Sequence, residues 1–258
     1  MTIRVGTSGY SFTDWIGPFY PTRVRDRDMF TYYTGHFDTV EINYTFYRMP
    51  SPRTLTRLQQ ISPDGFSFWV KAYRTITHEY QPADIPAFVA ALAPLREAGK
   101  LAGVLLQFPQ SFHRTPDTRR YLQRVTQTFH EVPLAVELRH YTWQHPATLA
   151  SLRKYGHTLV VPDVPEIPAL YQTPPVATSR TGYVRLHSRN AANWYDAGVD
   201  RYDYDYTPEQ LRALLQGWRQ LEDQLDQVYT FFNNCHSGQA ARNAEAFRRL
   251  LEEPGAGP

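Results

Sequence analysis

Short apolar runs recur along this chain, and polar or ionisable side chains follow each of them at once. The clearest case spans residues 37–50, where an apolar stretch carries Glu41 and ends with Asn43, Tyr47 and Arg48. A strand that is covered on both faces reads as a continuous apolar run, and the carboxyl ends of parallel barrel strands carry the chemistry of such folds. The pattern therefore predicts buried parallel strands with functional side chains at their carboxyl ends.

Eight runs of this kind predict strands, at residues 3–7, 39–42, 67–71, 103–107, 134–137, 159–161, 183–186 and 228–232. Helical spacing or helix-start signals occur between them, at residues 23–35, 51–61, 84–99 and 145–156 and from residues 115, 207 and 238 onward. The proline-rich stretch 162–175 could replace a full helix.

This alternation predicts a single (β/α)8 TIM barrel over residues 1–253, with the active-site face at the C-terminal ends of the strands. The length of 258 residues suits such a barrel, which typically needs about 250. An open doubly wound sheet is the competing fold, but no G-x-G-x-x-G motif follows a strand. Residues 254–258 are expected to form a flexible tail.

Composition narrows the class of protein without naming a function. The formal net charge of +2 gives no bulk attraction to nucleic acid or membrane. Cys235 is the single cysteine, so neither an intrachain disulfide nor a cysteine-based zinc site is expected. The chain has no apolar run of about 18 residues and no signal-peptide pattern at its start, so we expect a cytoplasmic protein that does not span a membrane.

Several motifs in order along the chain resemble the YecE-like family, known as domain of unknown function 72. They are Gly6-Thr-Ser-Gly9, Val40-Glu-Ile-Asn43, Thr45-Phe-Tyr-Arg48, Leu106-Gln-Phe-Pro109, Val136-Glu-Leu-Arg-His140, Val184-Arg-Leu-His187 and Phe232-Asn-Asn234. The resemblance implies a (β/α)8 barrel that is distantly similar to the xylose-isomerase and endonuclease-IV type barrels, and it implies no particular reaction. Ser188 and Cys235 depart from the family pattern at the edge of the expected site.

Two carboxylates lie at strand ends and are candidates for proton transfer. Glu41 and Glu137 could act as general acid and base, with His187 as a third catalytic candidate. The alternative is that each carboxylate is neutralised in a structural ion pair by Arg48, Arg139 or Arg185.

Cations at the strand ends predict an anionic small-molecule substrate. Lys71, Arg139 and Arg185 would hold its charge, unless they only balance the nearby carboxylates. The complete set of expected substrate-binding residues is Asn43, Tyr47, Lys71, His78, Gln107, Arg139, His140, Trp143, Asp163, Arg185, Asn233 and Asn234. The acidic, tyrosine-rich segment 196–206 is expected to form a lid over this site.

A metal site is a separate question. Glu137, His140, Asp163, His187 and His236 fall near strand ends, but no H-x-H or H-E-x-x-H spacing occurs. No metal or cofactor is therefore assigned.

The sequence leaves three functional hypotheses. The first is an enzyme, a hydrolase or lyase that acts on a phosphorylated or nucleotide-like substrate in the barrel mouth. The second, which rests on fold analogy, is a nucleic-acid repair or processing enzyme, and the third is a non-catalytic metabolite-binding protein.

Overall fold

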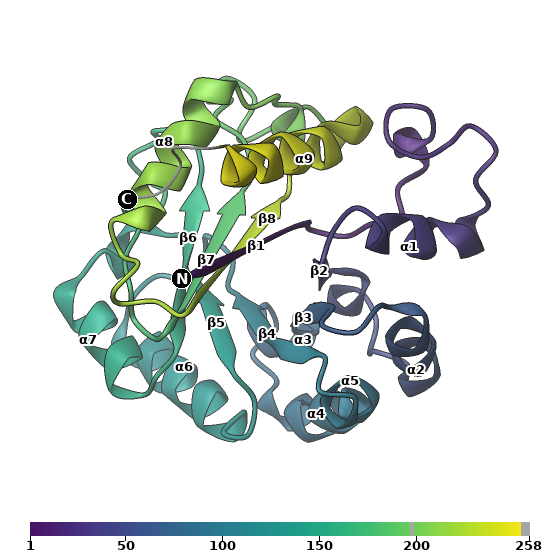
Figure 1. Cartoon of the computed structure of the whole chain (residues 1–258). Coiled ribbons are helices and arrows are strands. Elements are labelled where there is room, and N and C mark those ends of the chain that lie inside the picture. Colours follow the sequence, from purple (N-terminus) through teal and green to yellow (C-terminus); the bar gives the residue numbers. More distant parts are fainter. Residues whose placement is uncertain (197–198, 254–258) are drawn as a thin grey trace.

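The computed structural model describes residues 1–196 and 199–253, and it contains eight β-strands (Figure 1). The strands are β1 (Thr2–Thr7), β2 (Thr39–Ile42), β3 (Ser67–Lys71), β4 (Leu101–Gln107), β5 (Leu134–Glu137), β6 (Thr158–Asp163), β7 (Thr181–Leu186) and β8 (Gln227–Phe232). The strands β2, β3 and β5 match the prediction residue for residue. The other five begin one or two residues earlier, and β6 also ends two residues later. The predicted tail, 254–258, lies outside the described residues.

All strand pairs are parallel, and the order around the sheet is β1-β8-β7-β6-β5-β4-β3-β2. The two ends of this order meet through a single parallel bridge between Ser8 and Glu41. Because each strand lies beside its neighbours in sequence and the first strand meets the second, the sheet closes into a barrel. The prediction of a (β/α)8 TIM barrel is confirmed.

The seam between β1 and β2 is joined by a side chain from outside the sheet. The hydroxyl of Tyr33 accepts a hydrogen bond from the backbone of Thr7 at 2.9 Å and donates one to the carbonyl of Thr39 at 3.0 Å. Gly6 permits this close approach, because a Cβ at that position would lie 2.3 Å from the Thr39 carbonyl oxygen. The barrel therefore closes through the close approach of Gly6 to Thr39 and the buried hydroxyl of Tyr33, instead of a continuous ladder of backbone hydrogen bonds between β1 and β2.

Nine α-helices occur in the described residues and surround the sheet (Figure 1). They are α1 (Asp26–Thr34), α2 (Pro52–Ile61), α3 (Arg74–Thr77), α4 (Ile85–Ala91), α5 (Ala93–Glu97), α6 (Pro116–Thr128), α7 (Pro146–Lys154), α8 (Pro208–Arg219) and α9 (Gln239–Glu252). Six short 3-10 helices lie in the loops: η1 (Thr13–Trp15), η2 (Tyr44–Phe46), η3 (Pro82–Asp84), η4 (Tyr141–Trp143), η5 (Val199–Tyr202) and η6 (His236–Gly238). No helix of the described part of the chain is long and apolar enough to cross a lipid bilayer.

Of two predictions about helices, one is wrong and one agrees with the structure. The expected single helix over 84–99 is wrong, because the chain breaks at Leu92 between α4 and α5. Pro94 explains the break, since proline lacks the backbone N–H of a continuous helix and its ring clashes with the preceding turn. The proline-rich stretch after β6 does replace a helix: residues 164–180, all described, contain none.

The apolar core has two layers, one inside the barrel and one between the sheet and the helices. Inward-facing side chains fill the barrel interior, namely Trp69, Leu105, Ala135, Val160, Tyr183, Tyr229 and Phe231. The larger outer layer packs the helices on the sheet. The inner layer forms a solid floor below the carboxyl ends of the strands, so any ligand site lies above it.

Candidate functional site

A layer of polar side chains lies directly above the apolar interior of the barrel. Side chains alternate between the two faces of a strand, so a residue two positions after an inward-facing one also points inward. The inner-layer residues Trp69, Leu105, Ala135, Tyr183 and Phe231 are each followed at this spacing by a polar residue. The polar residues are Lys71, Gln107, Glu137, Arg185 and Asn233. Strand geometry thus brings five of the predicted site residues to one place.

Arg185 lies at the centre of this layer and binds both predicted carboxylates. Its Nη2 donates to Glu41 Oε1 at 2.7 Å, and its Nη1 donates to Glu137 Oε2 at 2.6 Å. The second oxygen of Glu41 accepts from the hydroxyl of Tyr183 at 2.6 Å. The two carboxylates have no exposed surface, and Arg185 is 1% exposed. This arrangement agrees with the ion-pair interpretation of the two carboxylates.

Two further side chains surround Glu137. Arg139 Nε donates to Glu137 Oε1 at 2.8 Å, and His187 Nε2 lies 3.3 Å from the same oxygen without forming a well-aligned hydrogen bond. Asn233 lies 2.9 Å from His187 Nδ1 and fixes the orientation of that ring. Arg48, the other predicted partner for a carboxylate, instead lies over the ring of Tyr44.

The electrostatics of this buried group follow from burial and from the arginines. Burial by itself raises the pKa of Glu137, but Arg185 and Arg139 outweigh it and hold that pKa well below its usual value. The pKa of Glu41 is lowered in the same way, mainly by Arg185 acting against burial. Burial lowers the pKa of His187 to about 4. Near pH 7 the group therefore consists of two carboxylates, two guanidinium cations and a neutral imidazole.

A cavity of ≈ 530 Å³ opens above this layer at the barrel mouth. We call it the mouth cavity. Its lining includes eight of the twelve predicted substrate-binding residues: Asn43, Tyr47, Lys71, His78, Gln107, Arg139, Arg185 and Asn233. It also includes four cationic side chains, from Lys71, Arg139, Arg185 and Arg201, and no carboxylate among its lining residues. The mouth cavity is thus a positively charged site within a chain of nearly neutral net charge.

Lys71 differs from Arg139 and Arg185 because it forms no ion pair with any described residue. Its Nζ lies 4.3 Å from the centre of the Phe46 ring. Burial lowers the pKa of Lys71 to about 7, and the charges of Arg185 and Arg139 act in the same direction. Burial, together with the charge of Lys71, also lowers the pKa of the neighbouring His78 to about 4. Lys71 therefore exchanges a proton near neutral pH.

Two predicted residues, His140 and Trp143, pack in the loop after β5 and do not line the mouth cavity. The ring of His140 stacks on His113 with 3.8 Å between ring centroids. The indole of Trp143 is buried, stacks on Phe112 and donates to the Phe112 carbonyl at 2.6 Å. Both contacts attach the loop after β5 to the loop between β4 and α6.

The other two predicted residues outside the mouth cavity are Asp163 and Asn234. Asp163 binds Arg189 at 2.7 Å and accepts from the Tyr206 hydroxyl at 2.8 Å. Asn234 is fully buried and donates to Asn243 Oδ1 at 2.8 Å. These two residues connect the ends of β6 and β8 to segments packed behind them.

Several cavity residues were missed by sequence reasoning. Ser8 and Phe46 lie within motifs already recognised, but nothing local marks them as facing the cavity. Arg201 and Tyr202 come from the segment expected to be a lid, of which residues 197 and 198 lie outside the described part. The described remainder of the segment does bring these two side chains to the mouth cavity.

The His and carboxylate side chains near the strand ends do not form a metal site in the described part of the chain. Across residues 1–196 and 199–253, no group of three or more His, Cys, Asp or Glu side chains is arranged to hold a metal ion. Burial raises the pKa of the Cys235 thiol, so the group is not a thiolate near neutral pH.

One family model and one known protein match nearly the whole chain, and a second known protein matches part of it. The family model described as "Protein of unknown function DUF72" matches residues 4–258. The chain is 30% identical to the UPF0759 protein YunF of Bacillus subtilis (strain 168), across 97% of this chain and 95% of that protein. It is also 30% identical to the UPF0759 protein YecE of Escherichia coli (strain K12), over 42% of this chain and 40% of that protein.

Solved structures of two relatives share the fold. A DUF72 family protein of Thermotoga maritima MSB8 is 37% identical, with a TM-score of 0.91 over 98% of this chain and 100% of that chain. A DUF72 family protein of Enterococcus faecalis V583 is 27% identical, with a TM-score of 0.86 over 98% of this chain and 96% of that chain. On the extent of these matches, and in agreement with the motifs at its strand ends, the chain belongs to the DUF72 family.

Proposed function

We propose that this protein is an enzyme, a hydrolase or lyase that acts on a small phosphorylated or nucleotide-like substrate in the mouth cavity. The observation that carries the proposal is the charge of the cavity lining, which has four cations and no carboxylate. Glu41 and Glu137 balance two of these charges from below. The remaining positive charge is available to an anionic ligand.

Among the three cations at the strand ends, two have donors left for such a ligand. Arg139 uses its Nε to bind Glu137, so this bond orients the guanidinium while its Nη atoms stay available. Lys71 has three ammonium donors and no carboxylate partner in the described chain. Arg185, in contrast, is held by two carboxylates in the polar layer. Phosphate oxygens therefore fit best between Lys71 and Arg139.

The rest of the mouth cavity suits the organic part of such a substrate. Phe46, Tyr47, Trp194 and Tyr202 supply aromatic faces on which a base or a sugar ring can stack. The volume of ≈ 530 Å³ lies within the range of about 300–1,000 Å³ that is typical of small-molecule sites.

Proton transfer is assigned to Lys71. A general acid or base works best when its pKa lies near the working pH, and the pKa of Lys71 is about 7. Glu137 lies in the polar layer with no exposed surface, so we assign it a positioning role through Arg139. In this reaction scheme Lys71 touches the substrate, and Glu137 acts through another residue.

The test compares the wild-type protein with Lys71→Met and with a control at an exposed lysine, Lys154→Met. Sugar phosphates and nucleoside monophosphates are screened by thermal shift, and compounds that stabilise the protein are incubated with it and followed by phosphorus NMR. We expect turnover by the wild type and by Lys154→Met, and none by Lys71→Met at an unchanged circular dichroism spectrum.

Other outcomes would overturn the proposal. Stabilisation without turnover of any compound would leave a metabolite-binding protein. Binding of short oligonucleotides alone, with a steep fall in affinity as salt rises, would favour a nucleic-acid processing enzyme, because phosphate contacts release counterions. Full turnover by Lys71→Met would remove Lys71 from the mechanism.

A further inference from the structure

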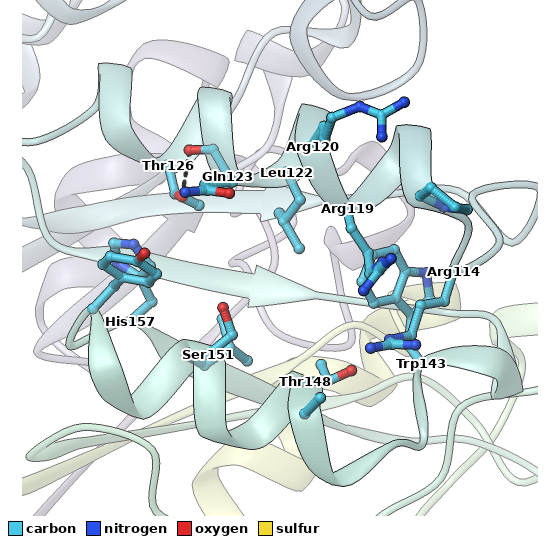
Figure 2. A pocket seen from close by; sticks show the side chains of 14 residues that line it. Arg114, Arg119, Arg120, Leu122, Gln123, Thr126, Trp143, Thr148, Ser151 and His157 are labelled. Carbon is cyan, nitrogen blue, oxygen red and sulfur yellow. Dashed lines mark hydrogen bonds between the residues drawn. The ribbon is translucent and has the colours of Figure 1, made fainter.

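A second cavity lies outside the barrel, between α6 and α7 (Figure 2). It has a volume of ≈ 350 Å³ and is formed by one face of each helix together with Arg114, Trp143 and His157. We call it the α6–α7 groove. It shares no lining residue with the mouth cavity, so a ligand there would be independent of the proposed reaction.

Apolar side chains form part of the walls of the α6–α7 groove, beside polar ones such as Gln123 and Thr126. Leu122 from α6 and Leu152 from α7 both line it. Figure 2 shows Trp143 at one end and His157 at the other, and the ring of Tyr155 lies 6.2 Å from the ring of His157. Covering these apolar side chains with an apolar ligand removes them from water and is favourable. The groove is therefore suited to a ligand with an elongated apolar part.

Cationic side chains gather at one end of the groove. Figure 2 shows Arg114 and Arg119 close to Trp143, whereas the guanidinium of Arg120 points away. Arg120 forms an ion pair with Asp117, but Arg114 and Arg119 have no carboxylate partner among the described residues. No Asp or Glu lines the groove. This end is complementary to an anionic head group.

Two buried polar atoms at the same end also lack partners. Thr148 is 5% exposed and its Oγ1 makes no hydrogen bond within the described chain. The Nε of Arg114 is buried and likewise unpaired. Burying an unpaired donor is unfavourable, and the oxygens of a bound anion would satisfy both groups.

We propose that the α6–α7 groove binds a small amphiphile with a single anionic head. The head lies between Arg114 and Arg119 and within reach of Thr148. The apolar body lies along Leu122 and Leu152 toward Tyr155.

Decanoate is a suitable probe, with decyltrimethylammonium as the cation of matched chain length. Isothermal titration calorimetry is carried out on the full chain. Ser151 is exposed and points into the groove, so Ser151→Trp should fill it and abolish the heat of decanoate binding. Ala150→Trp, at an exposed position of α7 that does not line the groove, should bind as the wild type does.

The head group is tested separately. Arg119→Gln should weaken decanoate binding about fivefold, as expected for one exposed charge contact. The control Arg124→Gln, on α6 but outside the groove, should leave the affinity unchanged.

Three results would overturn the proposal: no binding of decanoate, equal affinity for the cationic amphiphile, or unchanged affinity in Ser151→Trp. Sulfate, which lacks an apolar body, should not compete with decanoate. The readout is binding at a site apart from the mouth cavity, so failure here leaves the proposed reaction untouched.

Discussion

Arg185→Met removes the cation that lies between two fully buried carboxylates. Methionine is nearly as long and is apolar, so it fills the space without supplying charge. After the substitution Glu137 keeps Arg139 at 2.8 Å, but Glu41 keeps only hydroxyl groups, those of Tyr183 and Ser8, as close partners. The variant thus contains one buried carboxylate without a cation.

The magnitude follows from that single unpaired charge. Removing one partner of a buried ion pair costs about 3–5 kcal/mol. We therefore expect the free energy of unfolding near pH 7 to fall by about 4 kcal/mol. For a domain of this size the thermal midpoint should fall by about 8–16 °C. The matched control is Arg180→Met, because Arg180 pairs with Asp226 at the exposed surface and should contribute little.

The pH dependence has a definite sign. In the wild type the pKa values of Glu41 and Glu137 are lowered, so their stabilising contribution is present near pH 7 and is lost as pH falls through the folded-state values. In Arg185→Met burial raises the pKa of Glu41, so protonation on acidification stabilises the folded variant. The difference in stability between the two proteins should therefore shrink from pH 7 toward pH 5.

The assay is urea unfolding, followed by tryptophan fluorescence and by far-ultraviolet circular dichroism at both pH values. Adding Glu41→Gln to Arg185→Met removes the unpaired charge and should restore part of the lost stability. A loss below about 1 kcal/mol for Arg185→Met, or a double variant no more stable than the single one, would refute the reasoning.

Two further predictions follow from the site and from the seam. Sulfate remains a dianion from pH 6 to pH 8 while Lys71, with a pKa of about 7, loses its charge and His78 stays neutral. Sulfate affinity measured by calorimetry should therefore fall about tenfold over this range and become independent of pH in Lys71→Met; equal affinities in the wild type would contradict the assignment. Tyr33→Phe removes the hydroxyl that pairs with the backbone groups of Thr7 and Thr39 across the seam. The free energy of unfolding in urea should therefore fall by about 2 kcal/mol. An unchanged unfolding midpoint would show that the phenol does not join the strands.

The sequence by itself determined the barrel and the inward-facing polar layer. Buried parallel strands must be apolar on both faces, which made all eight recognisable. The alternation of side chains along a strand also placed Lys71, Gln107, Glu137, Arg185 and Asn233 at the mouth, because the position of a side chain within a strand depends only on local geometry.

Prolines in the sequence are local signals that mark where helices are absent or broken. The prolines after β6 indicated that a helix could be missing there, and residues 164–180 contain none. Pro94 carried the same kind of signal for the break at Leu92, although the apolar spacing of 84–99 suggested one helix.

Only the tertiary structure decided which charges pair. Glu41 and Arg185 are 144 residues apart, and the alternatives Arg48 and Arg139 were equally compatible with the sequence. Their pairing depends on which strands face each other across the closed barrel. The conformation of the loops determines the positions of the remaining side chains. It buries Trp143 against Phe112 and brings Arg201 to the mouth cavity. Such contacts arise from packing between distant segments, so no local pattern in the chain encodes them.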